Sequence, residues 1–168
     1  EDGWKKVNEL LEECTLKQIL DATSSIMCAS RSSGLYLPLP GLPGFSGVMT
    51  FLESIREPQQ LTKLAVNFRG EKIGFSGAQA LGEQLSKFQR LTTLTLYLRD
   101  NNLGSEGGKA LGESLGKLQK ITSLELWLQY NNLGPEGGKA LGESLGKLQK
   151  ITTLKLYLDN NQLGSEGG

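Results

Sequence analysis

Short stretches of the chain alternate apolar and polar residues, and the same alternation returns every 30 residues. In residues 91–120, Leu94, Leu96 and Leu98 are separated by single polar or aromatic residues, which predicts a strand with one buried face. The sequence Asn-Asn-Leu-Gly then marks a turn. The leucines that follow recur at the spacing of one helix face, at Leu111, Leu115 and Leu118. Each 30-residue unit is therefore predicted to form a strand, a turn and a helix.

The unit is repeated along most of the chain. Residues 121–150 differ from residues 91–120 at seven of 30 positions, residues 61–90 are a looser copy, and residues 151–168 are an incomplete fourth copy. One unit cannot bury its own leucines, but stacked units can. The repeats therefore predict an α/β solenoid with parallel strands in one layer and helices outside.

The motif Leu-x-x-Leu-x-Leu, followed by Asn-x-Leu and a helix, resembles the leucine-rich repeats of the ribonuclease-inhibitor class. The glycine-rich tracts are similar to repeats of unicellular eukaryotes such as ciliates and dinoflagellates. The resemblance is clear over 61–168 and weak over 31–60. One departure is that four residues, not two, separate the third leucine of the motif from the asparagine. Two extra residues preserve the alternation, so we expect a longer strand.

The resemblance implies that one asparagine in each repeat satisfies backbone groups in the turn, namely Asn101, Asn131 and Asn161. Glu71 occupies this position in the first full repeat. A carboxylate cannot donate a hydrogen bond, so we expect the row of asparagines to be broken or filled by water at Glu71.

The N-terminal part of the chain follows the pattern less closely. Residues 1–30 are predicted to form a helical cap, and residues 31–60 a degenerate first repeat with an intact helix and at best an edge strand. The apolar segment 35–45 is rich in proline and glycine, and we expect no regular α-helix in it. It is either tucked against the cap or a docking arm for a partner, formed by Leu35, Tyr36, Leu37, Leu39, Leu42 and Phe45.

Small residues line both flanks of the predicted helices. Gly108, Gly112 and Gly116 fall on one flank of the helix, and Ala110 and Ser114 on the other. Glycine costs about 1 kcal/mol relative to alanine inside a helix. We therefore expect these residues to allow neighbouring helices to approach closely.

The outward positions of the strands form three rows when the repeats are aligned. The middle row contains Tyr97, Trp127 and Tyr157, which should stack on the exposed face of the sheet. Exposed Tyr and Trp residues near Arg are typical of interaction hot spots, although the same stack also stabilises a sheet by contacts between strands, and both interpretations stay open. The predicted partner-binding residues are Tyr97, Trp127, Tyr157, Arg69, Arg99, Gln129, Asp159, Glu125 and Lys155.

Composition argues against several other classes of function. The chain has no histidine, and 18 basic residues balance 18 acidic ones, which disfavours metal sites, acid–base catalysis and electrostatic binding of nucleic acid. Gly108-Lys109 and Gly116-Lys117 lack the other residues of a phosphate-binding loop. We therefore predict no catalytic residues, no metal, no cofactor and no nucleic-acid partner.

The location is predicted from the cysteines and from the apolar residues. Only two cysteines occur, Cys14 and Cys28, and no secretory signal stands at the start, so we expect reduced thiols and favour an intracellular location, in the cytosol or an organelle, over secretion. No apolar run is long enough to span a membrane.

These features favour a non-catalytic protein-interaction module or scaffold that binds through the concave sheet face. The alternative is an accessory subunit of a large, organellar or membrane-bound complex, docked through the cap and segment 35–45. In either case we expect a larger polypeptide or assembly. The fourth repeat lacks its helix, which would leave leucines uncovered at Leu154, Leu156 and Leu158.

Overall fold

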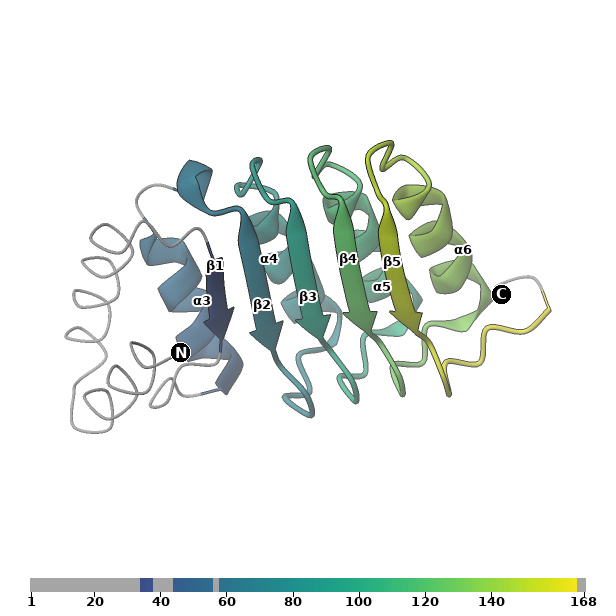
Figure 1. The fold of residues 1–168 in the computed structure, drawn as a ribbon. Helices are drawn as coiled ribbons and strands as arrows, with labels where there is room; N and C mark the ends of the chain where they lie inside the picture. The colour runs from purple at the N-terminus through teal and green to yellow at the C-terminus, as the bar shows by residue number, and fades with distance from the viewer. Residues whose placement is uncertain (1–33, 38–43, 56–57, 166–168) are drawn as a thin grey trace.

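The computed structural model describes residues 34–37, 44–55 and 58–165 of the 168-residue chain, so the predicted cap over 1–30 lies outside the described residues. The elements are β1 (Gly34–Leu37), α3 (Gly44–Ser54), the 3-10 helix η1 (Pro58–Gln60), β2 (Lys63–Asn67), α4 (Gly74–Leu85), β3 (Thr93–Tyr97), α5 (Gly104–Leu115), β4 (Ser123–Trp127), α6 (Gly134–Leu145) and β5 (Thr153–Tyr157). The strands form one parallel sheet in chain order, and the helices cover one of its faces (Figure 1). The predicted α/β solenoid is confirmed.

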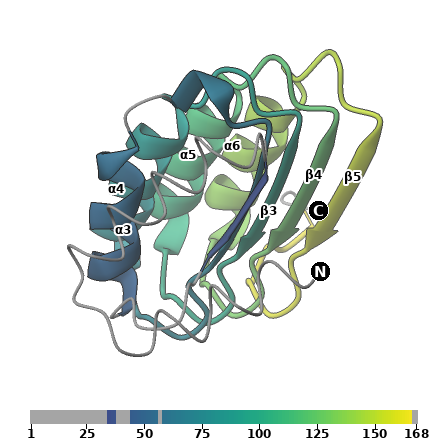
Figure 2. The same cartoon turned by 60° about the vertical axis from the view of Figure 1, so that its left-hand side comes forward.

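The register of the sheet follows the repeat. From β2 to β5 each residue pairs with the residue 30 positions later, as in Leu64 with Leu94 and Leu94 with Leu124. Beyond the end of β3 the Asp100 N–H still donates to the carbonyl of Gln129 at 2.9 Å. The strand itself ends at Tyr97, and Asp100 has a φ of +60°, so the expected longer strand is not formed. The inward leucines pack against the helix layer, seen from the side in Figure 2, and form one continuous core.

A buried row of asparagines closes the turn after each strand. The side-chain oxygen of Asn131 accepts a hydrogen bond from the Asn101 N–H at 3.0 Å, and that of Asn161 accepts one from the Asn131 N–H at 3.0 Å. Each side-chain amide also donates to a carbonyl of the repeat before, at Phe68, Leu98 and Leu128 respectively. Buried backbone groups need such partners, so the row links each turn to the next.

Glu71 changes this row at the first full repeat. Its carboxylate accepts a hydrogen bond from the backbone N–H of Phe45, at the start of α3, at 3.3 Å. The Glu71 side chain is exposed, and its own backbone N–H donates to the carbonyl of Phe68 at 3.2 Å instead of to the side chain of Asn101. The buried row of asparagines is therefore broken at Glu71, as expected, because a carboxylate has no proton to donate.

Glycine brings the helices close together, as the spacing predicts. A Cβ atom on Gly112 of α5 would lie 3.1 Å from the Cα of Leu141 in α6, and one on Gly82 of α4 would meet the side chain of Ser114 in α5. Contacts this short leave little room for a larger side chain.

Segment 35–45 takes two different structures where it is described. Residues 34–37 form the edge strand β1, whose residue Gly34 pairs with Lys63, a separation of 29 residues instead of 30. The helix α3 begins at Gly44, so the expectation of no α-helix through residue 45 was wrong for the last two residues. The Phe45 ring packs edge-on against Phe68, with centroids 5.0 Å apart. Phe45 is therefore part of the solenoid.

The β5 end of the sheet exposes apolar side chains. Leu154 is 45% exposed and Leu156 is 36% exposed, whereas their partners Leu124 and Leu126 are buried. A Cβ atom on Gly142 of α6 would meet nothing within 4 Å among the described residues, although the equivalent position Gly112 is crowded. This end therefore presents the same kind of surface that β4 and α5 bury.

Candidate interaction surface

The aromatic row lies on the sheet face opposite the helices, called here the open sheet face. Tyr97 pairs with Trp127, and Trp127 pairs with Tyr157, in adjacent strands. The rings of Tyr97 and Trp127 are 5.7 Å apart with a 33° tilt, and those of Trp127 and Tyr157 are stacked at 4.0 Å. All three side chains are half-buried. Tyr97 and Trp127 alternate with buried leucines, and Tyr157 continues the same register, so the row forms a continuous aromatic ridge on this face.

Polar side chains hold the central ring of the row in place. The indole N–H of Trp127 donates to Oε1 of Glu125 at 3.0 Å, and Nζ of Lys155 lies 3.6 Å from Oε2 of the same carboxylate. The ion pair is partly exposed and contributes little stability by itself. Its consequence is local: two charges from neighbouring strands restrict the orientation of the Trp127 indole.

The third predicted row does not lie on one face. Arg69 and Asp159 are exposed, and Arg99 is half-buried with its guanidinium 4.9 Å from the ring centre of Tyr130. Gln129 is only 7% exposed, so its predicted outward position was wrong. Strand β4 ends at Trp127, and the alternation of faces does not extend two residues into the turn. The buried Oε1 of Gln129 has no hydrogen-bond partner among the described residues.

The predicted docking arm is only partly described. Leu39 and Leu42 lie outside the described residues, and for Leu35, Tyr36 and Leu37 the structure gives only the strand β1. Phe45 belongs to α3. The arm as an exposed binding segment is therefore a prediction that stays untested.

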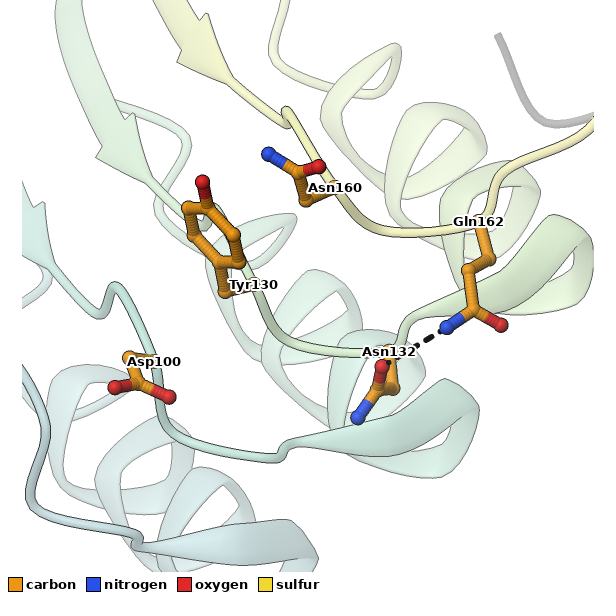
Figure 3. A pocket seen from close by; sticks show the side chains of 5 residues that line it. All are labelled: Asp100, Tyr130, Asn132, Asn160 and Gln162. Carbon is orange, nitrogen blue, oxygen red and sulfur yellow. Dashed lines mark hydrogen bonds between the residues drawn. The ribbon is translucent and has the colours of Figure 1, made fainter.

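A groove that the sequence did not reveal lies beyond the C-terminal ends of β3, β4 and β5. It has a volume of about 420 Å³ and is lined by Asp100, Tyr130, Asn132, Asn160 and Gln162 (Figure 3). The amides of this edge form a second row, in which Asn132 donates to Asn102 at 3.1 Å and accepts from Gln162 at 3.2 Å. The change from Asp100 to Tyr130 between nearly identical repeats was the signal in the sequence, but the pattern alone does not show a groove.

Comparison with known proteins agrees with the architecture. The family model described as Leucine Rich repeat matches residues 90–112 and 118–142. No curated protein sequence matches the chain. The match and the parallel strand–helix repeat identify the fold as a leucine-rich-repeat solenoid. Such repeats generally mediate protein–protein interaction and are typically non-catalytic.

The described part of the chain was also compared with the features of membrane-spanning helices and of metal sites. None of the helices in the described part of the chain has the length and apolar character needed to cross a membrane. The same part contains no group of three or more acidic or cysteine side chains placed to hold a metal ion.

Proposed function

We propose that the chain is a protein-interaction module that binds its partner on the open sheet face, through the aromatic row and the charges beside it. The observation that carries this proposal is the ridge formed by Tyr97, Trp127 and Tyr157. Large aromatic side chains bury much apolar area at a low cost in side-chain entropy, which makes them frequent interaction hot spots. Their neighbours Arg69, Glu125, Lys155 and Asp159 supply polar contacts at the rim.

A comparative capture experiment tests which face binds. The full chain, the variant Trp127→Ala and the helix-layer variant Glu113→Ala are used as baits under identical conditions. Glu113 is exposed on α5, on the opposite side of the molecule from the ridge. We expect one protein to be retained by the full chain and by Glu113→Ala but lost with Trp127→Ala. Retention by Trp127→Ala together with loss by Glu113→Ala would place the binding surface on the helices.

A second proposal concerns the exposed end at β5. We propose that Leu154 and Leu156 pack against a second copy of the chain, which fits the expectation of a larger assembly. Burying one leucine side chain contributes about 1.5–3 kcal/mol, so the two exposed leucines favour association.

Sedimentation of the 168-residue chain tests this second proposal. We expect concentration-dependent association, and a monomer after Leu154→Lys and Leu156→Lys, because an inserted charge opposes burial of the surface. A stable monomer of the unchanged chain at all concentrations would contradict the proposal.

A further inference from the structure

The groove at the C-terminal edge of the sheet has an unusual chemical character. Asp100 carries a carboxylate, and the other four lining side chains are a phenol and three primary amides, all uncharged and all planar (Figure 3). Amides and phenols both donate and accept hydrogen bonds, and the ring of Tyr130 adds an apolar surface. The groove therefore suits a ligand that combines hydroxyl groups with an apolar face.

Tyr130 sits where its backbone conformation is unfavourable. Its φ angle is +59°, in the left-handed region that bulky residues avoid, and the equivalent positions are Gly70, Asp100 and Asn160, which tolerate it better. The side chain is 47% exposed, so packing within the protein offsets little of this cost. Positive φ angles recur in every turn of this edge, and Tyr130 is the aromatic residue among them, which leaves its ring available to contact a ligand.

The charges around Tyr130 restrict what binds there. The guanidinium of Arg99 already lies 4.9 Å from the ring centre, so a second cation on this ring would be repelled. The carboxylate of Asp100 in the groove wall disfavours an anion. The two groups carry opposite charges, so together they give the groove no net preference for a cation or an anion.

The amides are also partly pre-oriented. The side chain of Asn132 donates a hydrogen bond to Asn102 and accepts one from Gln162. These bonds restrict the orientation of the three side-chain amides, and each amide still has donors or acceptors free for a ligand. Groups fixed before binding lose less entropy when a ligand arrives.

We propose that the groove binds a neutral sugar unit, whose C–H face packs on the Tyr130 ring and whose hydroxyl groups bond to Asp100, Asn160 and the neighbouring amides. This role is separate from partner binding on the open sheet face.

A titration followed by NMR tests the proposal on the full chain. Glucose, galactose, mannose, N-acetylglucosamine, maltose and cellobiose are added separately, with N-acetyl-arginine amide and acetate as charged probes. We expect saturable chemical-shift changes for at least one sugar, centred on residues 100, 130, 132, 160 and 162, and none there with the charged probes. If no sugar gives saturable changes, or if a charged probe shifts these residues and the sugars do not, the proposal is overturned.

Two variants distinguish the loss of the Tyr130 ring from an effect on sugar binding that any surface substitution would have. Tyr130→Asp installs the residue that repeat 91–120 already carries at Asp100, in the same backbone conformation, so the fold is kept. We expect it to weaken sugar binding about tenfold, which is the upper range for loss of one aromatic contact. The control Glu143→Ala, exposed on α6, should bind as the unchanged chain does. Equal binding by Tyr130→Asp would overturn the assigned role of the ring.

Discussion

At the scale of single residues, the buried asparagines tie one repeat to the next. Asn131 donates to carbonyls of two repeats and accepts from the N–H groups of Asn101 and Leu103. These backbone groups are buried, so a lost partner leaves them unsatisfied. The turn thus depends on an amide that both donates and accepts.

Asn131→Asp separates these two functions, because the carboxylate keeps the acceptor and removes the donor. We expect a loss of about 2 kcal/mol in the free energy of unfolding, measured by urea denaturation. The neighbouring change Asn132→Asp is the control, since Asn132 is exposed. Equal losses in the free energy of unfolding for the two substitutions would show that the buried amide of Asn131 does not stabilise the protein more than the exposed one of Asn132 does.

A substitution at Tyr130 is expected to raise stability, opposite to the effect of Asn131→Asp. Tyr130→Asn replaces a bulky residue with φ +59° by the type found at Asn160 in the same conformation. We expect the free energy of unfolding to rise by about 0.5–1 kcal/mol, because asparagine tolerates the left-handed region better. A thermal melt measures the change. A lower Tm would show that the contact of Tyr130 with Arg99 outweighs the backbone strain.

The sequence predicted some of these residues and missed others for a physical reason. Within the strands, alternation predicted the outward faces of Tyr97, Trp127 and Tyr157, because side chains there must alternate. Beyond Trp127 the chain enters a turn with left-handed residues, and no simple period applies. The burial of Gln129 and the groove at Tyr130 therefore needed the three-dimensional structure.

At the scale of helices, identical sequences in different surroundings provide a direct comparison. Residues 106–120 and 136–150 have the same sequence. A Cβ atom on Gly112 would lie 3.1 Å from the Cα of Leu141, whereas one on Gly142 would meet nothing within 4 Å among the described residues. The same substitution should therefore have opposite effects at the two sites.

We expect Gly112→Ala to destabilise the protein by about 1–3 kcal/mol through overpacking. Gly142→Ala should stabilise it by up to about 1 kcal/mol through helix propensity. Urea denaturation of the 168-residue chain, at a concentration too low for association, measures both. Stabilisation by both substitutions would show that α5 and α6 are not closely packed, and destabilisation by both would show that the flank of α6 is covered.

The first repeat shows the limits of prediction for whole elements. The helix α3 is the intact helix predicted for the degenerate first repeat, and its first residues, Gly-Phe-Ser-Gly, recur 30 residues later at the start of α4. The shifted pairing of Gly34 with Lys63 was not predicted, since prolines and glycines remove the alternation that sets a register. Local pattern thus predicts an element only where the repeat is intact.

At the scale of the whole molecule, stacking builds both the apolar core and the aromatic row on the open sheet face. The repeats up to residue 150 contribute buried leucines to one core, and the same register places one aromatic residue of three successive repeats in a single row. A solenoid of this kind displays a long surface built from equivalent positions, so changes confined to those positions alter recognition without changing the fold. Repeats 91–120 and 121–150 differ at two of these outward positions, with Thr95 replaced by Glu125 and Tyr97 by Trp127.

The most direct test of the proposed function is the affinity of the captured partner for Trp127→Ala, measured by calorimetry beside the unchanged chain and Glu113→Ala. We expect Kd to rise about 30-fold or more for Trp127→Ala, corresponding to about 2 kcal/mol for a hot-spot aromatic residue, and to stay unchanged for Glu113→Ala. An unchanged Kd for Trp127→Ala, in a variant that keeps the unfolding free energy of the original chain, would contradict binding through the aromatic row.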